Sequence, residues 1–206
     1  MRGAWFIAGF FTLGILQGQK LVEKSLAADQ VRFIEIDAAN CYRISLGTRP
    51  TENVEVVAHM DGEYAGKLMV SLEEREGTVS IRAGFLPGFM APNDKLGAHK
   101  VVSISLEIFL PPHRWVRLRG TDCQVWASGE YRLLAIDLGG GSCHLRALSQ
   151  RVEAHTQSGD IWLTTDRGVI RAISDHGRVL REDIPMGDPR FVLGSVEGDI
   201  HIQKTK

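Results

Sequence analysis

The sequence has little of what marks metal-binding, nucleic-acid-binding or membrane-spanning proteins. Its 206 residues include three cysteines, Cys41, Cys123 and Cys143, and none of them has the C-x-x-C spacing of a metal site. Basic and acidic residues nearly cancel, 24 against 25, so the composition indicates neither a nucleic-acid nor an anionic-membrane partner. The longest uncharged apolar run falls short of the roughly 20 residues that a spanning helix needs.

The residues that carry catalytic chemistry are scattered. The seven histidines are dispersed, and no two carboxylates recur with a base at a fixed position. The run Gly139-Gly140-Gly141 resembles a calcium-binding turn, but no aspartate occupies the ligand position in repeated turns. No helical periodicity follows these glycines, as a nucleotide-binding loop would require. The sequence therefore predicts no catalytic site, no metal and no cofactor.

The N-terminus has the pattern of a secretory signal. Arg2 precedes the uncharged run Ala4 to Leu16, which is typical of a signal-peptide core. We expect a signal peptide over residues 1–19, removed near Gly18 or Gln19, with no membrane span afterwards. The alternative is a buried N-terminal strand or helix. Export to the periplasm or cell surface would permit disulfides, yet the odd cysteine count favours three buried thiols over a Cys123–Cys143 bridge.

Residues 116–206 contain a repeat. A glycine followed two residues later by an apolar or small core side chain recurs at Gly141, Gly159 and Gly177, each 18 residues from the next, and again at Gly198, 21 residues on. Chemically similar residues also match at this spacing. They are Leu145 with Leu163, Val152 with Ile170, Ala154 with Ala172, and Thr156 with Ser174. A fixed period of this length is typical of a solenoid.

Each repeat contains two short alternating segments separated by glycine-containing turns. Ile161 and Leu163 alternate with outward residues, and Ile170 and Ala172 follow after the turn at 166–168. Two all-β arrangements fit: a parallel solenoid with about 18 residues and two strands per coil, or an antiparallel meander of short hairpins. The solenoid is favoured because a parallel stack places like residues above one another, whereas a meander gives no reason for the match.

Residues 20–115 show longer alternating segments joined by short turns, which predict leading antiparallel hairpins that continue into the solenoid. The stretch 84–99 interrupts them with two prolines and several glycines, so it is not a regular element. Its apolar side chains predict either a lid over one edge of the sheets or a partner-binding loop.

The chain resembles the bacterial adhesin-like β-strand-repeat proteins, exported solenoids of the head-GIN-domain kind. The resemblance covers residues 31–206 and rests on a strand ending in proline, Leu106 to Pro111, and on two repeated motifs, Ser158-Gly159-Asp160-Ile161 and Glu197-Gly198-Asp199-Ile200. It implies a cell-envelope protein without catalytic activity, an adhesin-like binding or scaffolding module. The alternative function is a carbohydrate-active β-helix enzyme acting on polysaccharide.

One row of residues is a candidate binding site. If Val125, Cys143 and Ile161 point inward, then Trp126, His144 and Trp162 point outward in register, with Leu180 extending the row. Exposed tryptophans in a row offer a rigid apolar surface for an envelope protein or a polysaccharide. The alternative is that the leading hairpins or the loop at Phe85 to Met90 cover this face as a second core.

Overall fold

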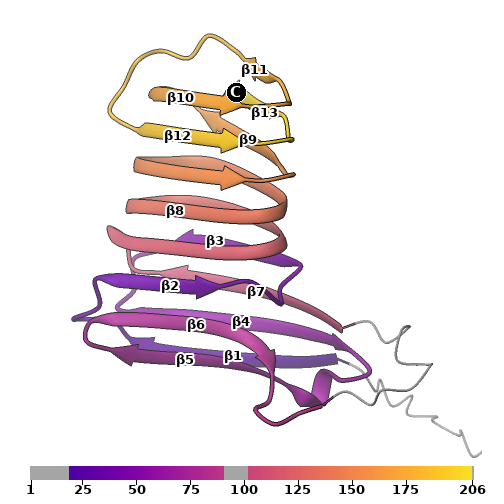
Figure 1. Ribbon diagram of the computed structural model, residues 1–206. Helices are drawn as coiled ribbons and strands as arrows, with labels where there is room; N and C mark the ends of the chain where they lie inside the picture. Colours follow the sequence, from indigo (N-terminus) through magenta and orange to yellow (C-terminus); the bar gives the residue numbers. More distant parts are fainter. Residues whose placement is uncertain (1–18, 91–101, 206) are drawn as a thin grey trace, which may run out of the picture.

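The computed structural model describes residues 19–90 and 102–205, and these residues form an all-β protein (Figure 1). The strands are β1 (Gln19–Ala27), β2 (Phe33–Asp37), β3 (Arg43–Thr48), β4 (Asn53–Gly62), β5 (Leu68–Arg75), β6 (Thr78–Phe85), β7 (Val102–Leu110), β8 (Arg114–Thr156), β9 (Asp160–Thr165), β10 (Val169–Ser174), β11 (Val179–Arg181), β12 (Arg190–Ser195) and β13 (Ile200–Lys204). One 3₁₀ turn, η1 (Ala65–Lys67), precedes β5. The all-β prediction is confirmed. Among the described residues no helix is long and apolar enough to cross a membrane.

The strands are stacked along one axis and form two faces, which β8 joins by winding back and forth between them (Figure 1). The first face contains β1, β4, β7, β3, two parts of β8, β9, β13 and β11. The second face contains β5, β6, β2, other parts of β8, β12 and β10. Inward-pointing residues of both faces meet in a single core.

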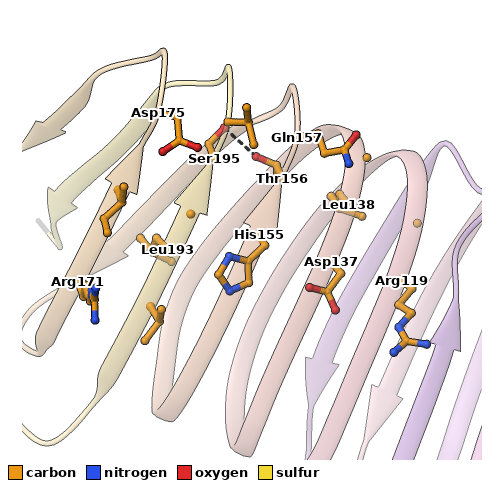
Figure 2. A pocket seen from close by; sticks show the side chains of 16 residues that line it. Arg119, Asp137, Leu138, His155, Thr156, Gln157, Arg171, Asp175, Leu193 and Ser195 are labelled. Carbon is orange, nitrogen blue, oxygen red and sulfur yellow. Dashed lines mark hydrogen bonds between the residues drawn. The ribbon is translucent and has the colours of Figure 1, made fainter.

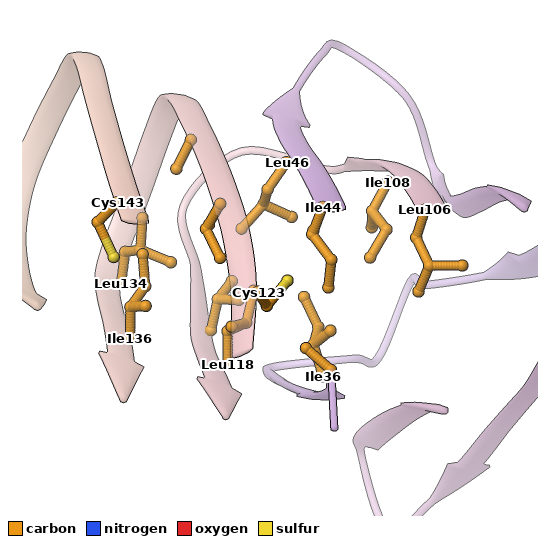
Figure 3. Close-up of a cluster of buried hydrophobic side chains, with 14 of the residues drawn as sticks. Ile36, Ile44, Leu46, Leu106, Ile108, Leu118, Cys123, Leu134, Ile136 and Cys143 are labelled. Carbon is orange, nitrogen blue, oxygen red and sulfur yellow. The ribbon is translucent and has the colours of Figure 1, made fainter. Parts of the chain in front are cut away.

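That core is continuous from the first strands to the last. Ile44, Val125, Cys143, Ile161 and Ile200 occupy equivalent inward positions on successive strands of the first face, and all are fully buried. Figure 3 shows the side chains of Ile36 and Leu118 from the second face reaching the same cluster. Because strand alternation sends every second residue inward, the intervening residues face solvent.

Strand β9 pairs in parallel with β8 on one side and with β13 on the other, and it does not pair with β10. Cys143 lies opposite Ile161 and Leu145 lies opposite Leu163, which is the 18-residue offset seen in the sequence. This pairing matches the parallel arrangement rather than the antiparallel meander.

The order of the last two layers differs from the sequence prediction. The repeat matches Val152 with Ile170, but Val152 pairs with Phe191, and Phe191 in turn pairs with Ile170. The residues 190–204 are thus inserted between the layer at 151–165 and the layer at 169–181. The inserted layer buries the larger side chains: Phe191 and Leu193 are 1% and 2% exposed, whereas Ile170 and Ala172 are only partly buried.

Hydrophobic burial accounts for this insertion. A layer inside the stack is covered on both sides, so placing phenylalanine and leucine there removes more apolar area from water than placing isoleucine and alanine there. The extra residues between Arg181 and Arg190, with Ile184 buried against the core, allow the chain to cross from the outer layer to the inner one. The outer edge of the stack is therefore formed by β10 and β11, not by the C-terminal strand.

The leading region is not simply a set of antiparallel hairpins, which corrects the prediction for residues 20–115. Within the described part of this region, only β5 and β6 form a hairpin between consecutive strands, while β1, β4 and β7 pair antiparallel across longer separations. Strands β2 and β3 pair in parallel with β8. The turn at Ala38–Cys41 carries the chain from one face to the other, and alternation alone does not distinguish such a corner from a hairpin.

Part of the glycine- and proline-rich stretch 84–99 lies outside the described residues, as does the predicted signal peptide up to residue 18. In the described part, Phe89 stacks on Phe85 with ring centroids 5.0 Å apart and lies 5.3 Å from the Tyr64 ring. Leu86 and Met90 are exposed. This segment packs beside η1.

Candidate functional site

The central feature of the first face is a row of four aromatic rings, hereafter the ring row. Trp126 and His144 stack with centroids 4.7 Å apart and planes 6° apart. His144 and Trp162 stack at 4.7 Å and 5°, and Trp162 and His201 stack at 5.1 Å and 4°. Each ring thus lies nearly parallel to its neighbours.

Strand alternation and strand spacing produce this geometry. Trp162 follows the buried Ile161 and lies between His144 on β8 and His201 on β13. Adjacent strands are about 4.8 Å apart, which is close to the separation of stacked aromatic rings. Rings at equivalent outward positions on parallel strands therefore stack directly, without any distortion of the backbone.

Stacking covers most of the flat faces of the rings. Each face of His144 and of Trp162 is occupied by a neighbouring ring. The outer face of Trp126 is covered by the guanidinium of Arg43, whose Cζ lies 4.8 Å from the ring centroid. Beyond His201 the next residue in register is Leu180. The row consequently presents ring edges to solvent, and all four rings are only partly exposed.

A hollow of about 390 Å³ lies beside the ring row and borders Trp126, His144 and Trp162. Gly47 has no side chain and that of Ser128 is small, which leaves room beside the larger Phe109 and Trp126. Arg146 also lines the hollow, and within residues 19–90 and 102–205 no ion pair of this arginine is found. The hollow, which Glu107 also lines, thus combines aromatic edges with a cation and a carboxylate.

The surroundings of His144 favour its neutral form. Partial burial lowers the pKa of His144 from its ordinary value, because leaving water disfavours the charged imidazolium. Nε2 of His144 lies 3.2 Å from Oγ of Ser142, so the two groups form a hydrogen bond whose direction depends on the tautomer. His144 is therefore harder to protonate than an exposed histidine.

The structure brings together all three residues that the sequence singled out, Trp126, His144 and Trp162. It places His201, rather than Leu180, next to Trp162, because the layer at 190–204 is inserted. The motif Gly198-Asp199-Ile200-His201 matches Gly159-Asp160-Ile161-Trp162, and this match could have identified His201 from the sequence. The described part of the loop at Phe85 to Met90 contacts Tyr64 instead of the ring row.

The carboxylates of Asp160 and Asp199, at the corners that lead into β9 and β13, have structural partners. Oδ1 of Asp160 accepts a hydrogen bond from the backbone of Asp199, and Asp199 pairs with Arg178 at 2.9 Å. The hydrogen bonds from Arg178, first its backbone N–H, lower the pKa of the Asp199 carboxyl. In the described part of the chain no group of three or more histidine, cysteine and carboxylate side chains is arranged to hold a metal ion.

The three cysteines are free and buried, without a Cys123–Cys143 bridge. Burial raises the pKa of each thiol to about 12. Because the thiolate is the reactive form, none of these cysteines is suited to act as a nucleophile in the folded protein.

Comparison with known proteins yields fold neighbours and no sequence relatives. No protein-family model and no curated protein matches the chain. A solved structure from Clostridium sporogenes, named "putative cell adhesion protein", superimposes with a TM-score of 0.58 at 12% identity, covering 90% of this chain and 100% of that one. A "putative adhesin" from Bacteroides fragilis has a TM-score of 0.40 at 12% identity, covering 89% of this chain and 97% of its own. The likeness to the clostridial protein shows a shared fold.

Proposed function

We propose that this protein is a non-catalytic binding or scaffolding module of the bacterial cell envelope, and that the ring row is its main contact surface. The observation that carries the proposal is the row itself: Trp126, His144, Trp162 and His201 stand side by side on an outer face, and the first three border a hollow of about 390 Å³. Rigid aromatic surface that is not fully buried is typical of protein interaction sites. The name of the clostridial fold neighbour is consistent with such a role.

The geometry of the rings favours a protein partner over a polysaccharide at this site. Sugar rings bind aromatic residues by lying against the flat face of the ring. Both faces of Trp126, His144 and Trp162 are occupied by neighbouring rings or by Arg43. The exposed edges carry positive partial charge, and they suit edge-to-face contact with aromatic residues or carbonyl oxygens of a partner. Arg146 at the rim suits a carboxylate.

The alternative, a carbohydrate-active enzyme, has less support. Asp137 and Asp175 both line the hollow of the second face, but they are three strand spacings apart, or roughly 14 Å. Glycosidases that use two carboxylates hold them at separations of roughly 5 to 9.5 Å. Asp160 and Asp199 are adjacent, yet their oxygens are engaged by backbone N–H groups and by Arg178.

The architecture that we propose for residues 116–206 is a short parallel β-solenoid with two strands per coil, preceded by a leading region over residues 20–115. The 18-residue offset of Cys143 and Ile161 supports this interpretation. The glycine column at the corners also supports it. A Cβ atom on Gly159 would overlap the carbonyl of Gly141, and one on Gly198 would overlap the carbonyl of Gly159.

Export is the localisation that we propose, with a signal peptide over residues 1–19. The uncharged run Ala4 to Leu16 supports it. N-terminal sequencing of the protein from fractionated cells tests it, and the expected first residue is Gln19 or Lys20. Recovery of intact Met1 from the cytosol would contradict export.

The proposed contact surface is tested by photo-crosslinking in the native envelope. A photoreactive amino acid at Thr164, which lines the hollow beside Trp162, is expected to capture one discrete protein. The matched control carries the same amino acid at Glu35 on the second face, which is exposed. If no crosslink forms at Thr164, or if the same protein is captured equally well from both positions, the ring row is not the contact surface.

A further inference from the structure

A second hollow, of about 740 Å³, crosses the second face of the stack over β8, β12 and β10 (Figure 2). It is not part of the ring row, which lies on the first face. One line of outward positions runs through it, in the order Arg119, Asp137, His155, Gly194 and Ile173. We refer to this hollow as the second-face groove.

Glycine makes room in the middle of the groove. Gly194 is the one position of that line without a side chain, and it lies between His155 on β8 and Ile173 on β10. A Cβ atom on Gly194 would come within 2.6 Å of Nδ1 of His155, so the imidazole leans across the glycine. Figure 2 shows the His155 ring beside this strand, with Asp137 and Arg119 following on the neighbouring strands.

Polar side chains around the groove have no protein partner. Among the residues that the structure describes, no side-chain hydrogen bond or ion pair is found for Arg119, Asp137, His155, Arg171 or Asp175, all of which are exposed. On the first face, by contrast, Arg43 stacks on Trp126 and Asp199 pairs with Arg178. The groove thus concentrates hydrogen-bonding groups that are free to engage a ligand.

The charges of the groove restrict the class of that ligand. Arg119 and Arg171 would repel a cation, and Asp137 and Asp175 would repel an anion. A purely apolar ligand would remove these four charged groups from water without replacing their hydrogen bonds, which is costly. A neutral ligand that both donates and accepts hydrogen bonds satisfies all of them.

Apolar side chains complete the lining. Ile173 and Val196 are 50% and 40% exposed, and Val192, two residues before Gly194 on β12, also lines the groove. A ligand that matches the groove therefore needs apolar C–H surface together with many hydroxyl groups. Saccharides combine these two properties, because their ring carbons are apolar and their hydroxyls donate and accept.

We propose that the second-face groove binds a neutral saccharide chain, separately from any protein held by the ring row. Arg119, Arg171 and His155 donate to hydroxyl oxygens, and Asp137 and Asp175 accept from hydroxyl groups. The sugar ring carbons lie against Ile173 and Val192, over the space left by Gly194. The second face would thus bind a saccharide through its charged groups, and the first face a protein through the ring row.

The test uses the full chain and titration calorimetry with defined oligosaccharides. The probes are neutral hexamers of β-1,4-glucose, α-1,4-glucose and β-1,4-N-acetylglucosamine, with hexagalacturonate and the chitosan hexamer as charged comparators. At least one neutral hexamer is expected to bind about tenfold or more tightly than both comparators. Gly194→Leu, which fills the groove, is expected to weaken that binding about tenfold or more. Because Gly194→Leu displaces only the end of the His155 side chain, the fold should persist, which far-UV circular dichroism checks.

Two further variants keep the test decisive. Asp175→Ala removes an exposed hydrogen-bond acceptor and should also weaken saccharide binding. It takes the place of Gly194→Leu if that variant fails to fold. Trp162→Ala should leave saccharide binding unchanged. Absence of binding by all three neutral hexamers at millimolar concentration, or tighter binding of a charged comparator, would overturn the proposal. So would a saccharide affinity that Trp162→Ala lowers and Gly194→Leu does not, which would place the sugar on the ring row.

Discussion

The ring of His201 lies 5.1 Å from that of Trp162 and within 4° of parallel, although the two residues are 39 positions apart in the sequence. The contact exists because β13 pairs directly with β9. The contact joins a residue of the inserted layer to the ring row. The order of the last two layers therefore determines which residues make up the proposed binding surface.

Replacing Trp162 should separate binding from folding. Trp162→Ala is expected to lower the affinity for the envelope partner about tenfold or more, since a tryptophan at the centre of an interface can contribute about 2 kcal/mol or more to the free energy of binding. Because Trp162 is only partly buried, the far-UV circular dichroism spectrum should be unchanged. The matched control is Trp115→Ala on the second face, where Trp115 stacks on Phe33 at 5.0 Å. Global unfolding of Trp162→Ala without loss of a partner would instead identify the row as part of the core.

The inserted layer can be tested by comparing two core truncations. Phe191→Ala should lower the free energy of unfolding by about 3–5 kcal/mol, because Phe191 is buried between two layers. Ile170→Ala should lower it by roughly 1–2 kcal/mol, because the outer layer is covered on one side only. Urea denaturation measures both values. The opposite order would mean that residues 169–181, and not 190–204, occupy the inner layer.

The glycine column should tolerate no side chain. Gly159→Ala places a methyl group where the backbone carbonyl of Gly141 lies, so the two layers must move apart to relieve the overlap. We therefore expect the free energy of unfolding to fall by about 3 kcal/mol or more. Gly66→Ala is the control, because a methyl group there meets no atom within 4 Å. Thermal unfolding of the two variants compares them. Equal melting temperatures would show that the layers are not in contact at this corner.

Stability should fall on mild acidification because of His144. Burial lowers its pKa in the folded protein, so below about pH 6.5 the unfolded chain binds a proton that the folded chain does not. The free energy of unfolding should therefore decrease from pH 6.5 down to the native pKa and stay flat above that range. His144→Gln should remove this part of the pH dependence. In an NMR titration of His144, a native pKa of 6.5 would mean no such dependence, and a native pKa above 6.5 would reverse its sign.

The sequence was sufficient for the features that depend on local alternation and on the 18-residue offset between residues 142–146 and 160–164. It predicted an all-β chain, the inward positions of Cys143 and Ile161, their 18-residue offset, and the outward row of Trp126, His144 and Trp162. These features follow from neighbouring residues in register, because side chains alternate along a strand and parallel strands repeat at a fixed spacing.

Only the tertiary structure decided which layers are neighbours. Val152 is compatible with Ile170 and with Phe191, and alternation is satisfied either way, so the pattern does not choose between them. The choice is made by the whole stack, which gains more from burying Phe191 and Leu193 inside than Ile170 and Ala172. That one choice placed His201 beside Trp162 and Gly194 beside His155, and so completed the ring row and opened the groove on the second face.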